Sequence, residues 1–328
     1  MTGSLVPVVD LTAPGDRVVA AIDAACRDVG FFAVTGHGVP DGLADAAWDA
    51  AREFFDLPRD EKMEVAFPSP GYPYGYSPVA YETLAASLGD GGLPDLKESL
   101  AVGPDCLGPP PPSTDPGEAW IRSASRWPRR PAGLREAWCS YFVEMSALAA
   151  RLLGLMARAL ALADDHFAPL IDRHTSAMRA LRYPALAVPP PPGQLRAGAH
   201  TDYGTLTILR TDSVSGLQIR SPDGSWSPVP SVPGGFVVNL GDSMAQWTND
   251  HWRSTLHRVV VDLDEHGAAP ERQSFAFFHM ANWDARIECL PSCREPDRPP
   301  RHEPVLAGPW LMRKFQRSVD AELAANDG

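Results

Sequence analysis

The segment "GAHTDYGTLTIL" at residues 198–209 carries His200 and Asp202, separated by one residue, in a run that is typical of a β-strand. Side chains alternate across an extended chain, so both groups are expected on one face, about 7 Å apart along the strand, where they can reach one metal ion. On a helix the same spacing would direct them to nearly opposite faces. An H-x-D triplet arises by chance roughly 0.7 times in a chain of this composition, so its meaning depends on its surroundings.

A third ligand is expected from a later strand, and the candidates are four histidines: His251, His257, His266 and His279. His257 is the best placed, because in "TLHRVVVD" it shares a strand face with Val259 and Val261 and so points inward. His266 lies in a turn, His251 precedes a strand, and His279 is the reserve candidate. A lone histidine on an apolar face is commonly a hydrogen-bonded core residue. Because His200 and Asp202 face the same interior, we predict that His257 is a metal ligand.

Two imidazoles and one carboxylate leave other coordination positions of an ion open, and this donor set is typical of non-haem Fe(II) oxygenases. Zinc hydrolases use the same donor types, so the cosubstrate distinguishes the two classes. An Fe(II) oxygenase that consumes a 2-oxo acid needs an anchor for the distal carboxylate of that acid.

The segment "RQSFAFF" at residues 272–278 offers such an anchor, because Arg272 and Ser274 again share one strand face. A guanidinium and a hydroxyl that point the same way can bind a carboxylate at two points. Tyr183, in "LRYP", can add a phenolic hydrogen bond. The alternatives are an ion pair of Arg272 with an acid of the chain, and core packing for Tyr183.

The elements that must position these residues differ between the two halves of the chain. Between residue 196 and about residue 282, short runs rich in Val, Thr, Ile and Phe alternate with turn clusters, which predicts an antiparallel sandwich or barrel. The first half predicts helices over 16–29, 41–55 and about 131–164, with strands between them. Two proline runs, 109–112 and 189–192, are expected to be stiff connectors.

Composition limits the classes of function. The formal net charge of −12, with 29 basic residues against 41 acidic ones, argues against a nucleic-acid or anionic-membrane partner. Five cysteines at irregular spacing do not predict a disulfide framework, and we expect a reducing compartment. The start of the chain has no signal-peptide pattern, so a cytoplasmic location is expected. The apolar stretch 145–164 contains Arg151 and Arg158 and is expected to be a buried amphipathic helix.

Nine segments, taken in order, resemble the isopenicillin N synthase-like branch of the Fe(II)/2-oxoglutarate-dependent oxygenases: "GHGV", "FFDLPRDEK", "DLKESLAVG", "LRYP", "RAGAHTDYGTLTIL", "GLQI", "VVNLGD", "STLHRVV" and "RQSFAFF". The resemblance extends from about residue 5 to about residue 290. It implies a mainly β fold with flanking α-helices, in which the core is a double-stranded β-helix, or jelly roll. Residues 1–328 would form a single oxygenase domain. Its parts would be a mostly helical flank with the first strands (about 1–180), the jelly-roll core (about 181–290) and a C-terminal helix (about 308–328).

The resemblance also assigns roles to residues of this chain. It implies His200, Asp202 and His257 as ligands of Fe(II), and Arg272, Ser274 and Tyr183 as the binding site of 2-oxoglutarate. Many members have Asn two residues before the tyrosine, where this chain has Leu181, so one supporting contact to the cosubstrate is absent.

The activity that the resemblance implies is the oxidation of a small molecule by O2, with 2-oxoglutarate converted to succinate and CO2. The substrate would be hydroxylated, desaturated or cyclised, in specialised or natural-product metabolism, and no obligate protein partner is evident. Three alternatives remain open: an isopenicillin N synthase-type oxidase that uses no 2-oxo acid, a zinc hydrolase, and a jelly-roll module that only binds a ligand.

By analogy with the family, the substrate pocket is expected to be lined by residues 71–81, 97–102 and 308–319 and by Phe236, with Tyr74, Tyr76 and Tyr81 as candidate contacts. Lys97 and Glu98 are expected to form a structural ion pair. Asn239 and Asp242, in "NLGD", are interpreted as turn residues.

Overall fold

The computed structural model describes residues 5–69, 71–85, 92–109, 112–294, 297 and 299–326, with side chains to residue 316. The proline run 109–112 therefore lies partly outside the described residues. The helices are α1 (Gly15–Asp28), α2 (Asp41–Phe55), α3 (Arg59–Met63), α4 (Pro116–Ile121), α5 (Leu134–Ala159), α6 (Ala168–Ile171), α7 (Asp242–Trp247) and α8 (Ala307–Asn326). Two short 3-10 helices, η2 (Pro104–Leu107) and η3 (Pro291–Cys293), accompany them.

Most of the strands form two sheets. The large sheet contains, in order, β1 (Val8–Asp10), β2 (Phe31–Thr35), β10 (Phe236–Leu240), β7 (Leu206–Thr211), β12 (Arg272–His279), β5 (Ala177–Tyr183), β4 (Glu98–Val102) and β3 (Gly75–Ser77). The small sheet contains β6 (Ala197–His200), β11 (His257–Val259), β8 (Leu217–Arg220) and β9 (Trp226–Pro228). A separate pair joins β13 (Arg286–Ile287) to β14 (Val305–Leu306). The jelly-roll expectation is confirmed, and β1 to β4 extend its large sheet.

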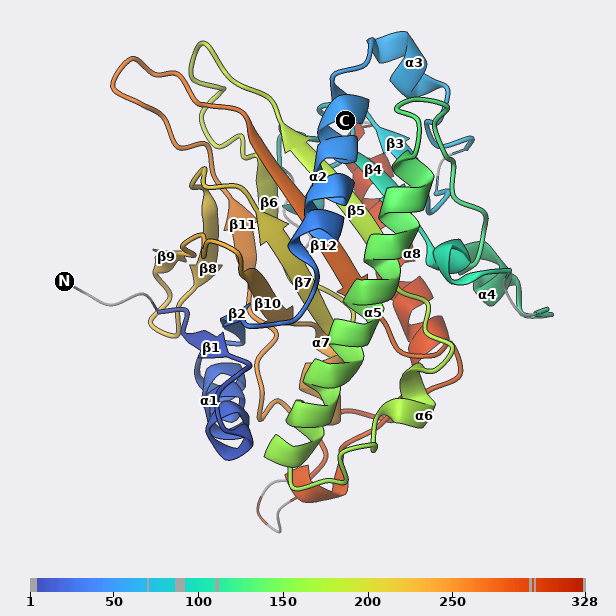
Figure 1. The fold of residues 1–328 in the computed structure, drawn as a ribbon, viewed down its shortest axis with the longest axis vertical. Coiled ribbons are helices and arrows are strands. Elements are labelled where there is room, and N and C mark those ends of the chain that lie inside the picture. Colours follow the sequence, from blue (N-terminus) through green and yellow to red (C-terminus); the bar gives the residue numbers. More distant parts are fainter. Residues whose placement is uncertain are drawn as a thin grey trace.

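Strand alternation gives the large sheet two different faces. On β12, Phe275 and Phe277 belong to the core shared with the helices, whereas Ala276 belongs to the core between the two sheets. Ring contacts attach α5 to the first face, since Trp138 and Tyr141 lie 4.8 and 5.2 Å from Phe275, centroid to centroid. In Figure 1, α5 crosses this face of the large sheet with α2 alongside. The face toward the small sheet is therefore left for the site.

Helix α5 forms because its apolar residues recur at helical spacing and bury one side, from Leu134 to Ala157. It is also long and apolar enough to cross a membrane by length and composition, a test that core helices pass as well. Arg151 and Arg158 lie on its outer side, where Arg151 donates to the Leu11 carbonyl and Arg158 pairs with Asp16. The expected buried helix is thus confirmed, although it ends at Ala159.

The cysteines differ from the expectation at one position. A disulfide joins Cys106 of η2 to Cys139 of α5, across 33 residues of sequence. Spacing did not predict this bond because only the fold brings the two segments together. Cys26, Cys289 and Cys293 are buried free thiols.

Candidate active site

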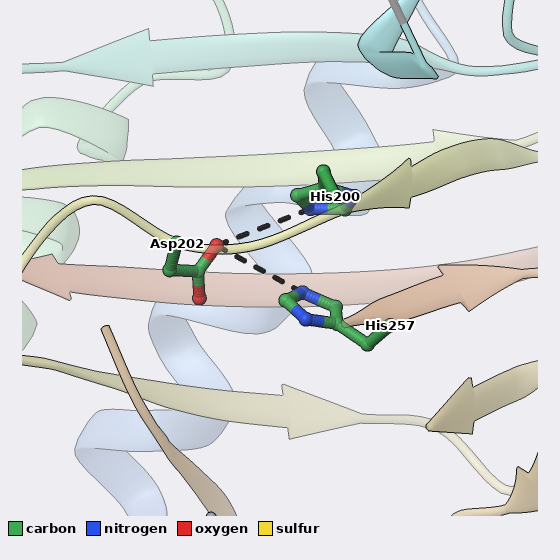
Figure 2. A group of neighbouring side chains, drawn as sticks. All are labelled: His200, Asp202 and His257. Carbon is green, nitrogen blue, oxygen red and sulfur yellow. Dashed lines mark ion pairs between the residues drawn. The ribbon is translucent and has the colours of Figure 1, made fainter. Parts of the chain in front are cut away.

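Three side chains from two segments far apart in the sequence meet between the two sheets. His200 ends β6, His257 begins β11, and the two residues are paired across the antiparallel ladder. Asp202 lies in the loop just beyond β6, so the extended pairing stops earlier than the sequence suggested. Its Oδ1 atom is 3.9 Å from Nε2 of His200 and 3.8 Å from Nε2 of His257 (Figure 2). Donors about 2.1 Å from one ion lie roughly 3 to 3.6 Å apart, so the group fits a metal with small adjustments.

Hydrogen bonds orient all three side chains. The Nδ1 atoms of His200 and His257 lie 2.8 and 3.1 Å from the carbonyl oxygens of Gly198 and Thr255. In the tautomer that donates Nδ1–H to these carbonyls, each Nε2 lone pair faces Asp202. The imidazoles are thus set to bind a cation through Nε2.

Asp202 is held in the same way. Its Oδ2 accepts from Oγ1 of Thr207 at 2.5 Å and from Nδ2 of Asn239 at 2.7 Å, which leaves Oδ1 toward the imidazoles. The turn interpretation of Asn239 is wrong, because this buried residue lies on β10 and supports Asp202. Asp242 begins α7 and accepts from Ser254 and Lys314.

Electrostatics favour the protonation states that a cation requires. Burial and the neighbouring His257 lower the pKa of His200 to about 3. Burial alone would raise the pKa of Asp202, but the two histidines and the bonds from Asn239 and Thr207 hold it below its usual value. At neutral pH His200 is therefore neutral and Asp202 is ionised, so both can donate electron pairs to a metal.

Of the four later histidines, only His257 belongs to this group among the described residues. His279, the reserve candidate, is buried on the helix side, where its Nδ1 lies 2.7 Å from Oγ1 of Thr205. His266 is exposed beside Glu265.

Arg272, Ser274 and Tyr183 come together on two adjacent strands. Arg272 is paired with Tyr183 across β12 and β5, and its guanidinium carbon lies 5.1 Å from the centre of the Tyr183 ring. Nε of Arg272 donates to the Val214 carbonyl at 3.2 Å, whereas Nη1 is buried without a partner. No carboxylate of the described residues forms an ion pair with Arg272, so the expected alternative, an internal salt bridge, is absent from this part of the chain. A buried cation of this kind fits an anionic ligand.

Arg196 is a second buried guanidinium at this end, and the sequence did not single it out. It is fully buried, and its guanidinium carbon lies 6.0 Å from the same Tyr183 ring. Nη2 donates to the carbonyls of Pro184 and Pro270, while Nε and Nη1 have no partner. Burial, and then the charge of Arg272, lower the pKa of Arg196. Two cations without an acid partner in the described chain therefore flank one phenol ring.

One cavity of about 240 Å³ contains both the three candidate metal donors and the candidate anchor. Its lining includes the triad of His200, Asp202 and His257, and also Tyr183, Arg272 and Ser274. The other lining residues include Tyr74, Lys97, Trp120, Arg179, Tyr203 and Phe315. The pocket expectation is therefore right for Tyr74 and for the C-terminal helix. It is wrong for Tyr76, whose hydroxyl donates to Glu98 at 2.5 Å in the core, and for Tyr81, which is 52% exposed.

The expectations for Phe236 and for the Lys97–Glu98 ion pair are wrong. Phe236 packs against His37 instead of lining the cavity. Lys97 does not pair with Glu98, because successive strand residues point to opposite faces: Lys97 pairs with Asp95 and Glu82, and Glu98 with Lys62.

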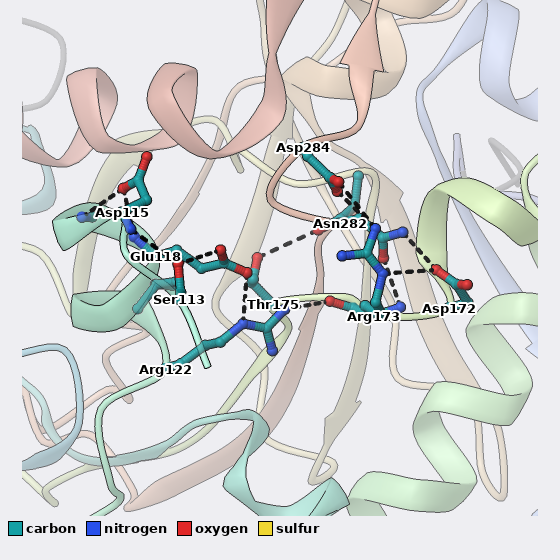
Figure 3. Close-up of polar contacts among 12 residues, drawn as sticks. Ser113, Asp115, Glu118, Arg122, Asp172, Arg173, Thr175, Asn282 and Asp284 are labelled. Carbon is teal, nitrogen blue, oxygen red and sulfur yellow. Dashed lines mark hydrogen bonds and ion pairs between the residues drawn. The ribbon is translucent and has the colours of Figure 1, made fainter. Parts of the chain in front are cut away.

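A polar network fixes the wall formed by α4, which the sequence did not place in the pocket. Arg122, just after α4, donates to Glu118 at 3.0 Å and to the Arg173 carbonyl at 2.6 Å (Figure 3). Arg173 in turn pairs with Asp284, beyond β12. The network ties α4, and with it Trp120, to the strands beside the metal donors.

Comparison with known proteins agrees with this geometry. A family model described as the N-terminal region of non-haem dioxygenases in morphine synthesis matches residues 6–130, and the 2OG-Fe(II) oxygenase superfamily model matches residues 175–281. The chain is 35% identical over 301 residues to validamycin A dioxygenase of Streptomyces hygroscopicus subsp. limoneus, covering 89% of this chain and 80% of that protein. It is 32% identical over 307 residues to the 2-oxoglutarate-Fe(II) type oxidoreductase hxnY of Emericella nidulans, covering 92% and 85%.

Among solved structures, that of a full-length Neurospora crassa protein in complex with alpha-KG superposes with a TM-score of 0.83 at 27% identity, covering 96% of this chain and 97% of that one. The same Neurospora crassa protein has also been crystallised with alpha-KG and thymine.

Proposed function

The chain belongs to the 2OG-Fe(II) oxygenase superfamily, and on that premise we propose that His200, Asp202 and His257 hold Fe(II) while Arg272 and Ser274 bind 2-oxoglutarate. The enzyme is a dioxygenase that uses Fe(II), O2 and 2-oxoglutarate and acts on a small molecule. The donor set fits the metal, since two imidazoles and a carboxylate are the ligands that this class of iron site uses. Bound Fe(II) supplies O2 activation, coupled to the oxidation of 2-oxoglutarate to succinate and CO2.

The residues of the chain perform the other tasks. Asn239 and Thr207 hold Asp202 so that one carboxylate oxygen faces the metal position. Arg272 and Ser274 orient the distal carboxylate of 2-oxoglutarate along β12, and Tyr183 closes that end. The apolar walls of the cavity limit the access of bulk water to the reacting atoms.

One observation carries this proposal: the guanidinium of Arg272 is buried, has no acid partner in the described chain, and lines the same cavity as the three donors. A buried cation of this kind calls for an anionic ligand, and the distal carboxylate of 2-oxoglutarate would supply it.

Succinate production tests the proposal. The wild-type protein should convert 2-oxoglutarate to succinate only with both Fe(II) and O2 present, faster when a metabolite panel supplies a substrate. Arg272→Met should abolish succinate formation at ordinary 2-oxoglutarate concentrations. Arg182→Met is a matched control, because Arg182 lies on β5 and pairs with Glu271 and Asp56 near the surface. Wild-type rates in Arg272→Met, or O2 consumption without 2-oxoglutarate, would contradict the assignment.

The proposal extends to cellular role and organisation. We place the enzyme in the specialised metabolism of small molecules, as one oxygenase domain in the cytoplasm, and its acidic surface is compatible with that location. A reducing cytoplasm would keep Cys106 and Cys139 as thiols, so the bond between them is the feature that tests this location. Acid quenching of the cells, then alkylation under denaturing conditions and mass spectrometry, distinguishes the two: all 5 cysteines are modified if the protein comes from a reducing cytoplasm, and Cys106 and Cys139 are protected otherwise.

A further inference from the structure

Arg179 is a cation of the cavity that has no role in the metal or cosubstrate site. It lies on β5 between Ala101 of β4 and Ala276 of β12, its cross-strand partners. Because both neighbours are small, the long side chain can extend over them, and it lines the cavity. Tyr183, at the cosubstrate end, is four residues further along the strand, about 13 Å away. Arg179 is therefore separate from the 2-oxoglutarate anchor.

Two acids and a lysine fix one side of this guanidinium. Nη1 of Arg179 donates to both carboxylate oxygens of Glu82, at 3.0 and 3.2 Å. Nζ of Lys97 lies 3.3 Å from Glu82 and 2.5 Å from Asp95. The side chains of Lys97 and Asp95 are each only 2% exposed, so this network is part of the buried wall. Although burial opposes its charge, Glu82 and Asp95 raise the pKa of Lys97, so Lys97 stays charged at neutral pH.

The rest of the guanidinium remains available to a ligand. Within the described chain, Nε and Nη2 of Arg179 make no hydrogen bond, and the side chain is 24% exposed. These two nitrogens form the planar donor edge that binds a carboxylate with two parallel hydrogen bonds. Lysine would not offer this geometry.

The network also reaches the metal donors. Asp95 accepts from the backbone N–H of Gly198 at 2.8 Å, and the carbonyl of Gly198 lies 2.8 Å from Nδ1 of His200. The donor edge of Arg179 is thus built on the same rigid framework as the triad. A ligand bound there has a fixed position relative to the metal position.

The remaining walls around this edge are apolar. The indole N–H of Trp120 donates to the Gly71 carbonyl at 2.9 Å, and the Tyr74 hydroxyl donates to the Ile121 carbonyl at 2.5 Å, so the polar tips of both are occupied. The centres of the Phe315 and Trp120 rings lie 5.7 Å apart. The cavity of about 240 Å³ is smaller than the roughly 300 to 1000 Å³ of common ligand pockets, and the cosubstrate shares it. The space fits a small apolar body.

Formal charges favour a monoanion. Glu82 and Asp95 balance Lys97 and Arg179. When Fe(II) and doubly charged 2-oxoglutarate are bound, Asp202, Arg196 and Arg272 leave a single excess positive charge, which one carboxylate would neutralise. The carboxylate of the lining, Asp202, is already assigned to the metal, so no acid of the described lining is left to pair with an ammonium group.

From these observations we propose that Arg179 binds the carboxylate of the substrate, and that the substrate is a small monocarboxylic acid whose apolar part lies between Trp120, Phe315 and the metal donors. This inference rests on the proposed function, because it takes the triad as the reacting centre. Glu82 is a positioning residue, since it orients Arg179 without lining the cavity.

Matched ligands and variants test the inference. The probes are aryl and alkyl monocarboxylates such as 3-phenylpropanoate and hexanoate, each with its primary amide and methyl ester, and L-phenylalanine as the ammonium-bearing counterpart of 3-phenylpropanoate. Binding is measured by calorimetry on the anaerobic protein loaded with Fe(II) and 2-oxoglutarate. We expect at least one acid to bind at least tenfold more tightly than its amide, ester or amino-acid counterpart. If no acid of the panel shows this preference, the inference is overturned.

The variants are Arg179→Met, the double variant Arg179→Met with Glu82→Gln, and the control Arg182→Met. The double variant removes both partners of the ion pair, so it should fold even if the excess negative charge at Glu82 prevents folding of the single one. In a folded Arg179 variant the preference for the acid should vanish, whereas 2-oxoglutarate affinity should stay at the wild-type value. Retained preference would refute the role of Arg179. If the wild-type protein loaded with Fe(II) did not bind 2-oxoglutarate, that result would instead refute the proposed function.

Discussion

At the end of the cavity next to Arg272, two buried guanidinium groups have no carboxylate partner among the residues that the structure describes. At the other end, the partly exposed Arg179 and the buried Lys97 pair with Glu82 and Asp95. An unpaired buried cation is unfavourable until an anion arrives, and a paired cation is stable without one. The first end is therefore suited to a ligand that every turnover requires, and the second to one that binds later and leaves without exposing a bare charge. The difference predicts that 2-oxoglutarate stabilises the fold more than substrate does.

The largest expected effect separates the two ends by stability. Lys97→Met removes one partner from a buried network and should lower the free energy of unfolding by about 3–5 kcal/mol. Arg272→Met removes a cation that has no acid partner and should change it by less than about 1 kcal/mol, or raise it. Urea unfolding without ligands measures both variants. Equal decreases in the free energy of unfolding would show that the ion pairs of Lys97 do not make its end of the cavity more stable than the end next to Arg272.

Affinity for the cosubstrate should show the reverse order. Arg272→Met should weaken 2-oxoglutarate binding by about 2–5 kcal/mol, because the distal carboxylate loses its charged partner. Arg179→Met should leave the affinity unchanged, since Arg179 lies at the other end. Calorimetric titration of the Fe(II)-loaded proteins with 2-oxoglutarate provides the measurement. A comparable loss of 2-oxoglutarate affinity in both variants would show that Arg272 and Arg179 belong to one anion-binding site.

Between the ends, the support of Asp202 can be tested by itself. Asn239→Ala removes the amide that donates to Oδ2 of Asp202, and metal affinity should fall about 10- to 100-fold with unchanged stoichiometry. Competition with a chelator of known affinity measures the change. Unaltered metal affinity would mean that Thr207 alone orients the carboxylate.

The smallest expected effect concerns the contribution of Arg196 to 2-oxoglutarate binding. Arg196→Met removes the second cation beside Tyr183, and 2-oxoglutarate affinity should fall by about 1 kcal/mol, roughly fivefold. The affinity for 2-oxobutanoate, which has no distal carboxylate, should stay constant. If both ligands lose the same affinity, Arg196 acts by packing and not by its charge.

The same comparison explains what the sequence could predict. His200 and Asp202, and Arg272 and Ser274, each lie two residues apart in one short segment, so each pair could be found from local spacing. Strand alternation places Arg272 and Ser274 together, whereas Asp202 lies in the loop directly after β6. The residues of the other end come from segments far apart in the chain. Arg179 and Trp120 have no local signal, because only the strand register and the packing of α4 bring them to the cavity.

The contacts that support the site residues could not be predicted from the sequence either. Asn239 precedes Leu240 and Gly241, and that turn-like sequence concealed its place on β10, opposite Thr207 of β7. The Lys97–Glu98 expectation failed because neighbours in sequence on a strand face apart. The first strands were assigned to a flank, although β2 pairs with β10 and extends the jelly-roll sheet, a long-range pairing that periodicity does not reveal.

The most direct test of the central claim is an anaerobic calorimetric titration with Fe(II), then with 2-oxoglutarate, of the wild-type protein and of Asp202→Ala, His257→Ala and His266→Ala. The wild type and the exposed control His266→Ala should bind one Fe(II) per chain and then one 2-oxoglutarate. Asp202→Ala and His257→Ala should lose tight binding of both. Tight, stoichiometric Fe(II) binding in either of these two variants would contradict the assignment of the metal site.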